Sequence, residues 1–302
     1  MTTARRISIL CRLCGLAPTL ALLALTPMAL PAAAFALDDD FSAPLSATWS
    51  APRTEEPGSS VSAPVADEDA VDGNVLELVF PGETAPEDSG PAFATEIETA
   101  TPAGYGTYEA RLRTPKASHA TGLVSAFFTY FNDGADHDFD GIIDNHEIDI
   151  ELLAAEPSTI YMSVWTEYQY EGGVETFRKT TRKVDLRSGR VWETPPGGEG
   201  SYDLVEAQPL AWSARRFRAW RAFATYRFAW SAGAVEYSID LGDGAGFRTL
   251  WTLTGAANET IPSIAAPLLF NLWHNAYHWN SGKESRVPRR NAAFHVDSVS
   301  IH

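Results

Sequence analysis

The chain has 302 residues, with 39 Asp and Glu against 23 Lys and Arg, which gives a formal net charge of −16 at pH 7. This charge repels phosphate backbones, so we exclude nucleic acid as a partner, and it disfavours acidic polysaccharides for the same reason. A neutral polymer remains compatible with such a surface.

The first 36 residues predict a signal peptide. Early arginines precede a long apolar run, which ends at the small-x-small sequence Ala34-Phe35-Ala36. Prolines interrupt the run, which makes it a poor span of the ~20 residues that a bilayer requires. Both cysteines of the chain lie inside this segment. We therefore expect a secreted protein that begins at Leu37 and has neither a membrane anchor nor a disulfide.

Residues 37–302 are expected to form one all-β domain. Residues 37–75 indicate an irregular first strand with loops, and residues 187–214 indicate a long surface loop. Helical periodicity is confined to an ambiguous stretch, Ser213–Arg221. Elsewhere short apolar segments alternate with Gly, Pro, Asn and Asp, which predicts an antiparallel β-sandwich jelly roll. The expected strands are Asn74–Phe80, Tyr105–Leu112, Leu123–Phe131, Glu147–Leu153, Thr159–Trp165, Ala224–Trp230, Ala234–Leu241 and Phe294–Ile301.

Residues 136–147 match the twelve-position pattern of a calcium-binding loop, Asp-x-Asp-x-Asp-Gly-x5-Glu. Both flanks resemble strands instead of the helices of an EF-hand, and the twelfth residue, Glu147, starts a segment of alternating acidic and apolar residues. We therefore expect a partial calcium site. Its ligands would be the carboxylates of Asp136, Asp138, Asp140 and Asp144 and the carbonyl of Ile142. The alternative is a solvated acidic turn that binds no ion.

The segment Glu147-Ile148-Asp149-Ile150-Glu151-Leu152 alternates strictly between acidic and apolar residues. On a β-strand successive side chains point to opposite faces, so the three carboxylates share one face and the aliphatic side chains bury the other. Carboxylates that share a face repel one another, which disfavours the pattern unless it serves a function. A solvated acidic edge strand is the alternative.

Glu147 and Glu151 are spaced for the two carboxyl groups of a retaining glycosidase. Four residues on a strand separate their Cα atoms by ~13 Å at ~3.3 Å per residue. If both side chains lean inward, the carboxyl groups approach the ~5–5.5 Å of a double displacement, not the ~6.5–9.5 Å of an inverting enzyme. Repulsion raises the pKa of one member and keeps it protonated as the acid, a role that we assign to Glu151. Asp149 lies between them and can hold Glu147 by a hydrogen bond.

The acidic strand resembles the Glu-x-Asp-x-Glu signature of glycoside hydrolase family 16, which includes lichenases, laminarinases and xyloglucan transglycosylases. Further segments resemble blocks of that family in the same order: Tyr105–Arg111, Gly122–Tyr130, Thr225–Trp230 and Phe270–Trp273. The resemblance runs from about Gly73 to the C-terminus. It implies a β-jelly roll with a cleft on its concave face, Glu147 as nucleophile, Glu151 as general acid/base and Asp149 as the assisting residue.

The resemblance also implies contacts to substrate and metal. The cleft would be lined by Glu96, Phe128, Tyr130, Ser163, Trp165, Asn271 and Trp273. Aromatic faces stack on sugar rings, and Asn and Glu bind hydroxyls, although packing is the alternative for each residue. A calcium ion on the convex face would use the carbonyls of Asp40 and Gly73 and the carboxylate of Asp297. Glu98 and Asn145 stand where lichenases carry an arginine and a tryptophan, which leaves the glucan linkage open.

Together these patterns predict a secreted, retaining endo-β-glucanase that hydrolyses a neutral β-1,3-1,4- or β-1,3-linked glucan. We expect a monomer that holds calcium as a structural ion outside the chemistry. A transglycosylase is one alternative, because it uses the same glycosyl-enzyme intermediate but transfers it to a sugar. A non-catalytic glucan-binding module is the other. The intact carboxylate triplet disfavours the module, because binding alone does not need a carboxyl pair that shares a proton.

Overall fold

The computed structural model describes residues 35–83 and 92–302. The cysteines and most of the predicted signal peptide, including Ala34, lie outside the described residues, so export of the chain stays a prediction. The described residues contain strands, turns and bends but no helix. Consequently, this part of the chain offers no helix long and apolar enough to cross a membrane.

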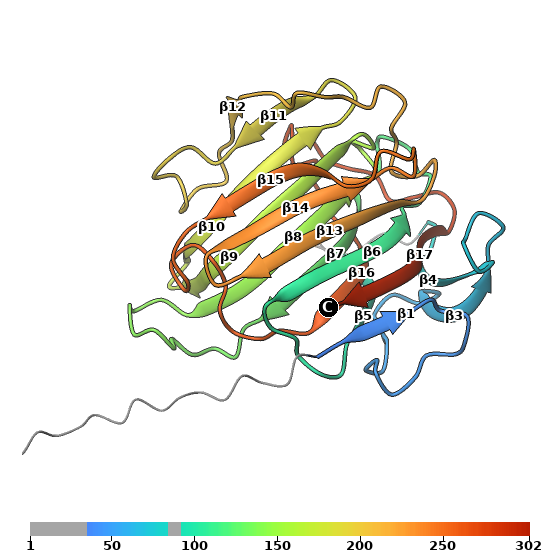
Figure 1. Cartoon of the computed structure of the whole chain (residues 1–302), viewed down its shortest axis with the longest axis horizontal. Coiled ribbons are helices and arrows are strands. Elements are labelled where there is room, and N and C mark those ends of the chain that lie inside the picture. Colours follow the sequence, from blue (N-terminus) through green and yellow to red (C-terminus); the bar gives the residue numbers. More distant parts are fainter. Residues whose placement is uncertain (1–34, 84–91) are drawn as a thin grey trace, which may run out of the picture. The chain divides into compact units, whose positions relative to one another are not determined.

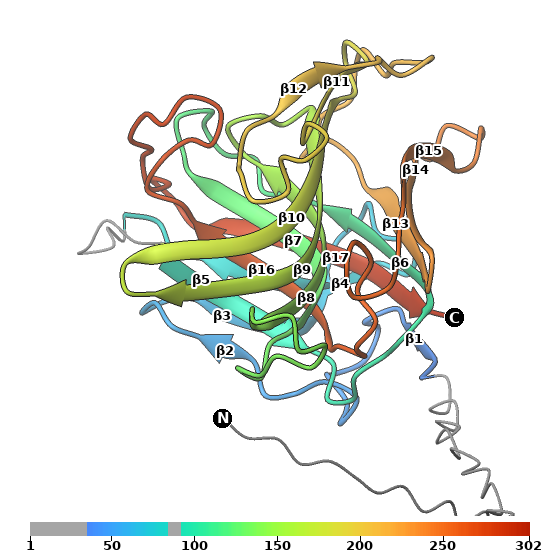
Figure 2. The ribbon, with the colours of Figure 1, turned by 90° about the vertical axis from the view of Figure 1, so that its left-hand side faces the viewer.

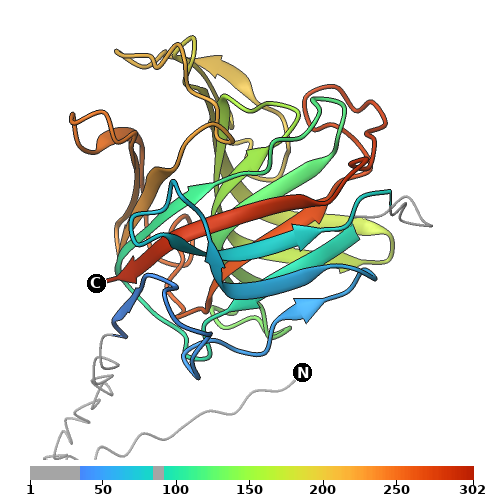
Figure 3. The ribbon, with the colours of Figure 1, turned by 90° about the vertical axis from the view of Figure 1, so that its right-hand side faces the viewer.

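The strands form two antiparallel sheets (Figure 1). The first sheet has the order β15-β14-β13-β6-β17-β4-β3, and β1 pairs with β17. Figure 3 shows the long strand β17 between β4 and β6. The strands of this sheet are β1 (Leu37–Asp39), β3 (Ser60–Ala66), β4 (Asn74–Phe80), β6 (Gly106–Arg113), β13 (Ala224–Ser231), β14 (Ala234–Asp240), β15 (Arg248–Thr254) and β17 (Ala292–Ile301).

The second sheet has the order β12-β11-β10-β9-β8-β7-β16-β5-β2 and carries the acidic motif on β8. Its strands are β2 (Arg53–Thr54), β5 (Ala92–Glu98), β7 (Leu123–Phe131), β8 (Asp144–Leu153), β9 (Thr159–Glu171), β10 (Val174–Asp185), β11 (Arg190–Glu193), β12 (Val205–Ala207) and β16 (Leu268–His274). Because β8 lies between β7 and β9, it is an interior strand. The alternative of a solvated acidic edge strand is therefore wrong.

The two sheets pack face to face (Figure 2), and one large apolar core with side chains from both sheets lies between them. Phe127 of β7 packs against Phe270 of β16 at 5.4 Å between ring centroids, and against Phe228 of β13 in the opposite sheet at 5.2 Å. All three rings are at most 1% exposed. Burying a side chain of this size contributes ~1.5–3 kcal/mol. The antiparallel β-sandwich predicted from the sequence is confirmed.

All of the expected strands are present. Two of them, Asn74–Phe80 and Leu123–Phe131, have the predicted bounds, whereas β8 starts earlier, at Asp144, and β9 continues to Glu171. The extension of β8 follows the pairing of Asp144 with Glu167, and the extension of β9 to Glu171 follows its pairing with β10. Polar residues therefore extend these strands where hydrophobic alternation has already ended.

Two segments hold more strands than the sequence analysis predicted. Residues 37–75 hold β1, β2, β3 and the start of β4, and residues 187–214 hold β11 and β12. In the second region Val191 is fully buried and pairs with Val184, so β11 continues the sheet despite the prolines that follow it. The ambiguous stretch Ser213–Arg221 forms turns without a helix.

Candidate active site

The acidic strand β8 directs its carboxylates away from the core. Ile148 and Ile150 are 0% and 2% exposed and belong to the core between the sheets. Because side chains alternate along a strand, Glu147, Asp149 and Glu151 share the opposite, outer face of the second sheet. The alternation predicted from the sequence is thus present in the structure.

The neighbouring strands bring all of the predicted cleft residues to this outer face. Directly paired residues of an antiparallel sheet lie side by side on one face. Tyr130 of β7 and Trp165 of β9 pair with Glu147, and Phe128 and Ser163 of the same two strands pair with Asp149. On β16, Asn271 pairs with Ala126, which is itself the partner of Glu151, and with Glu96 of β5. Trp273 of β16 pairs with Val124, two residues before Ala126 on β7. The structure therefore brings these residues together on one face, and their contacts to substrate stay a prediction.

Hydrogen bonds hold several of these polar groups in place. The Asn145 amide donates to Glu147 Oε2 at 3.2 Å, and Trp165 Nε1 donates to Asp149 Oδ2 at 3.2 Å. Further along the sheet, Glu96 accepts one bond from Arg53 at 2.7 Å and a longer one from the Asn271 amide at 3.4 Å. Asn145, which stands in place of a tryptophan, therefore orients the predicted nucleophile.

The environment separates the proton affinities of the three carboxyls. Burial raises the pKa of Glu151 to about 7, repulsion from Glu147 adds to the rise, and the Lys179 charge opposes it. Burial also raises the pKa of Asp149 well above its ordinary value, with repulsion from both glutamates adding to the effect. Burial raises the pKa of Glu147 as well, and the hydrogen bond between Glu147 and Asp149 opposes that rise while it raises the pKa of Asp149 further.

The direction of the Glu151 shift agrees with its predicted role as the acid, but burial, not like-charge repulsion, is its largest cause. Because the pKa of Asp149 is raised well above its ordinary value, its protonated form is favoured, and that form can donate a hydrogen bond to the carboxylate of Glu147.

A pocket of about 730 Å³ opens beside the acidic strand, lined in part by Ser163, Trp165 and Trp273. Sequence analysis did not identify the rest of its polar and aromatic lining, which includes Tyr161, Lys179, Lys183, Trp192, Tyr202 and Trp279. The period of two along a strand places Lys179 and Lys183 on one face of β10, but only their pairing with Trp165 and Tyr161 of β9 shows that this face belongs to the cleft. No spacing identifies Trp279, because it lies in the loop after β16.

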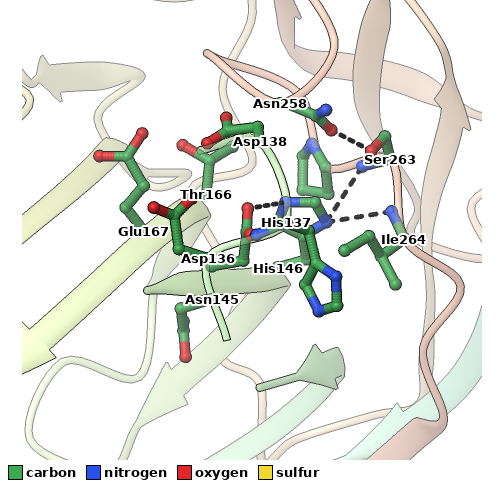
Figure 4. A network of polar contacts seen from close by, with 12 residues as sticks. Asp136, His137, Asp138, Asn145, His146, Thr166, Glu167, Asn258, Ser263 and Ile264 are labelled. Carbon is green, nitrogen blue, oxygen red and sulfur yellow. Dashed lines mark hydrogen bonds and ion pairs between the residues drawn. The ribbon is translucent and has the colours of Figure 1, made fainter. Parts of the chain in front are cut away.

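The predicted calcium loop gathers its acids into two overlapping groups. Ligand oxygens of Asp136, Asp138 and Asp144 lie within 4.8 Å of one another, and so do those of Asp138, Asp140 and Glu167. Figure 4 shows Asp136 and Asp138 of the loop together with Glu167 of β9. Glu167 was missed by sequence analysis. The four aspartates predicted as one ligand set therefore fall into two groups that share Asp138, and Glu167 of β9 belongs to the second group.

Protein groups already bind several of these carboxylates. Asp136 accepts from the amides of Phe139 at 2.6 Å and Gly141 at 2.8 Å. Asp144 accepts from the His137 amide and faces His146 Nε2 at 3.3 Å. Burial raises the pKa of Glu167 to about 7, although Arg178 lies 2.8 Å from its carboxylate and opposes the shift.

At the other predicted calcium site, the only side-chain ligand, Asp297, forms an ion pair with an arginine. Asp297 is 2% exposed and forms an ion pair with Arg111 at 2.5 Å, while its second oxygen accepts from the Val71 amide at 2.9 Å. The carbonyl of Gly73 accepts from the Asp67 amide. Arg111 thus supplies the positive charge that the prediction gave to an ion. Calcium binding at Asp40, Gly73 and Asp297 would have to compete with this ion pair, and it stays a prediction.

Sequence comparison places the acidic strand inside a known family pattern. Residues 65–186 match the model of "Glycosyl hydrolases family 16". A curated relative, the "Endo-1,3-1,4-beta-glycanase ExoK" of Rhizobium meliloti (strain 1021), is 34% identical over 206 residues, which are 67% of this chain and 54% of the relative. The "Beta-glucanase" of Paenibacillus macerans is 25% identical over 171 residues, or 57% of this chain and 48% of the relative. The chain spans about half the length of these curated relatives.

Solved structures show the same fold. A β-1,3-1,4-glucanase (lichenase) from a mouse hindgut metagenome superposes with a TM-score of 0.54 at 18% identity, covering 88% of this chain and 98% of that one. The β-glucanase of Bacillus licheniformis gives a TM-score of 0.51 at 18% identity, covering 88% and 97%. A Crh5 transglycosylase gives 0.50 at 17% identity, covering 88% and 83%.

Proposed function

The chain belongs to family 16 of the glycosyl hydrolases, and from this premise we propose that it is a retaining endo-β-glucanase acting on a neutral β-1,3-1,4- or β-1,3-linked glucan. The observation that carries the proposal is the triplet Glu147, Asp149 and Glu151 on one face of an interior strand, beside a pocket with aromatic walls. Its curated relatives are a β-glucanase and an endo-1,3-1,4-β-glycanase, which favours the same class of polymer.

In the proposed first step, Glu147 attacks the anomeric carbon and forms an ester bond to the sugar. The bond to the leaving oxygen breaks, and Glu151 gives that oxygen its proton. In the second step, Glu151 removes a proton from water, which attacks the anomeric carbon and releases Glu147 as a carboxylate. Asp149 holds Glu147 by a hydrogen bond throughout. The raised pKa of Glu151 supports its role as the acid at neutral pH.

A transglycosylase is the second candidate, because a sugar hydroxyl can replace water in the second step. A non-catalytic binding module is less well supported, since recognition of a neutral sugar requires no carboxyls with raised pKa values. We also propose that the chain is exported, as its N-terminal segment predicts, and that it acts as a monomer.

Release of reducing ends from barley β-glucan, laminarin and xyloglucan distinguishes these functions. The hydrolase is expected to release reducing ends from barley β-glucan or laminarin. A transglycosylase would release few reducing ends but would redistribute chain lengths when an acceptor oligosaccharide is added. Binding to a glucan with neither outcome would favour the module. Size analysis of early products tests endo-cleavage, because an endo-enzyme shortens the polymer before monomers accumulate.

We further propose that the Asp136–Asp144 loop binds a structural calcium ion. The donors are all oxygens, which Ca²⁺ prefers, and several carboxylates repel one another without a cation. Burial and the neighbouring aspartates raise the pKa of Asp138, which a bound divalent cation would reverse. The proposal gives the ion no part in the chemistry, because Glu147 must remain free to attack.

Asp138→Ala combined with Asp140→Ala is expected to remove one calcium ion per chain, measured after desalting by atomic emission. Because calcium would bind only the folded form, its loss should lower the melting temperature in excess calcium by about 5–10 °C. Substrate binding should weaken more than turnover, since the loop leads directly into β8. Asp243→Ala, in an exposed turn of the first sheet, is the control. An unchanged stoichiometry would mean that the loop is only an acidic turn.

A further inference from the structure

Lys179 places a positive charge beside the acidic strand. It lies on β10 and pairs with Trp165 of β9, which in turn pairs with Glu147 of β8. Its ammonium lies 4.2 Å from the centre of the Trp165 ring and 5.5 Å from that of Tyr202. Its backbone amide donates to the Glu199 carbonyl at 2.8 Å. The lysine is therefore held from both its backbone and its side chain.

The ammonium of Lys179 forms no ion pair with a carboxylate of the described residues, unlike that of Lys183. The Lys183 ammonium lies 2.7 Å from Glu156 and is thereby neutralised. Both lysines lie on the same face of β10, and both contact aromatic rings. The charge of Lys179 thus remains available to the carboxylates of β8, whereas the charge of Lys183 is already balanced by Glu156.

A local irregularity of the sheet gives Lys179 this position. The register between β9 and β10 shifts between Arg178, which pairs with Glu167, and Lys179, which pairs with Trp165. The shift leaves Thr166 as an extra residue on β9. Without this shift, Lys179 would pair with Thr166 and would lie on the face of the sheet opposite to Glu147. Bulges of this kind commonly re-aim side chains beside active sites.

We propose that Lys179 is a positioning residue, the counter-cation that keeps Glu147 ionised beside Asp149 and Glu151. The inference rests on the proposed function, because it names the group that sets the protonation of the same three carboxyls. Lys179 lowers the pKa of all three, as a nearby positive charge must. Trp165 then acts as a support for the ammonium and a donor to Asp149, and one face of its ring is not free to stack on a sugar.

The other charged or titratable groups near Lys179 do not replace it. From β8 it faces only the three carboxyls, and on β9 the ring of Tyr168 lies 6.2 Å from that of Trp165. From the loop before β12 come Tyr202 and Asp203, which line the pocket, and Tyr202 donates to Glu175 of β10 at 3.0 Å. The tyrosines are neutral and Asp203 is acidic, so none of these groups can replace the positive charge that Lys179 places beside the three carboxyls.

Lys179→Met and Lys179→Gln are expected to move both limbs of the pH profile of kcat/KM upward by about 0.5–1 unit. The acid limb rises because Glu147 becomes harder to ionise, and the alkaline limb rises because Glu151 holds its proton longer. Activity should therefore fall at acidic pH and rise on the alkaline side. Lys179→Arg keeps the charge and should restore both limbs.

Two controls separate this effect from general damage. Lys183→Met removes a neutralised lysine from the same face of β10 and should leave both limbs in place. Lys116→Met removes an exposed lysine that lies 5.0 Å from the Trp220 ring outside the cleft, and should leave activity unchanged. If Lys179→Met and Lys179→Gln fold but their pH profiles of kcat/KM coincide with that of the wild type, the proposal is overturned.

A carboxyl titration keeps the inference independent of activity. In protein labelled with ¹³C at Asp and Glu side chains, the carboxyl that titrates near pH 7 should move upward in Lys179→Met and Lys179→Gln but not in Lys183→Met. If no glucan is hydrolysed, the proposed function fails, and this titration still decides the role of Lys179. An unchanged titration would remove Lys179 as the counter-cation even if the chain is a glucanase.

Discussion

Glu147→Gln should abolish hydrolysis of barley β-glucan while leaving the fold intact. An amide keeps the shape of the side chain but cannot attack the anomeric carbon, so turnover should fall below about one hundredth of the wild type, given accelerations of ~10⁶-fold or more in enzymes. The Gln carbonyl can still accept from the Asn145 amide, which donates to Glu147 at 3.2 Å. Removing one of three neighbouring charges should also leave the melting temperature equal or higher.

The control for Glu147→Gln is Glu236→Gln, an exposed position on β14 of the first sheet. It changes the same chemical group on a strand that takes no part in the cleft, so activity should not change. Residual turnover above about one hundredth in Glu147→Gln, with a normal melting curve, would show that Glu147 is not the nucleophile.

Glu151→Gln should lower turnover on polymeric glucan by about 10²–10⁴-fold, the usual contribution of a positioned acid. Burial raises the pKa of Glu151 to about 7, so the wild type should lose activity as the pH rises through that value and the acid becomes ionised. The variant has no such proton to lose, and its alkaline limb should disappear. The measurement is the pH dependence of kcat/KM for both proteins.

A glucoside with an acidic phenol as leaving group separates the two steps of this reaction. Such a group departs without a proton, so Glu151→Gln should form the glycosyl-enzyme almost as fast as the wild type and then hydrolyse it slowly. Burst kinetics would reveal this pattern. An alkaline limb that survives in Glu151→Gln would assign the acid to another residue.

The sequence predicts the architecture where one face of a strand is apolar. On β4 and β7 the hydrophobic segments coincide with the strands, and on β8 the alternation of Glu147 to Leu152 correctly places the carboxylates opposite the core. β10 shows no such signal. Its cleft-facing residues include Lys179 and Lys183, so the strand is polar on the side that contributes to the pocket.

The part of the site that could be predicted from spacing is the set of carboxylates on a single strand, β8. Pairing between strands is a long-range property, and the register shifts beside Thr166 cannot be seen in the spacing of residues. Because of these shifts, Glu167 lies beside Arg178 and Asp144 and does not line the cleft with Trp165, two residues before it. They explain why sequence analysis missed both Glu167 of β9 beside the acidic loop and Lys179 beside the carboxylates.

The convex calcium site shows a different limit of sequence reasoning. A carboxylate at position 297 fits a metal ligand, but the pattern does not reveal that Arg111 of β6 lies beside it. A buried acid needs a cation, and an arginine satisfies this need as well as an ion does. Only the pairing of β6 with β17 brings Arg111 to Asp297.

The anomeric form of the first product tests the proposed mechanism most directly. Proton NMR during the first minutes of barley β-glucan hydrolysis distinguishes the anomers before mutarotation mixes them. Two displacements at one carbon, by Glu147 and then by water, predict that the β-anomer appears first and the α-anomer only later. An α-anomer as the first product would mean a single displacement and would contradict Glu147 as a nucleophile.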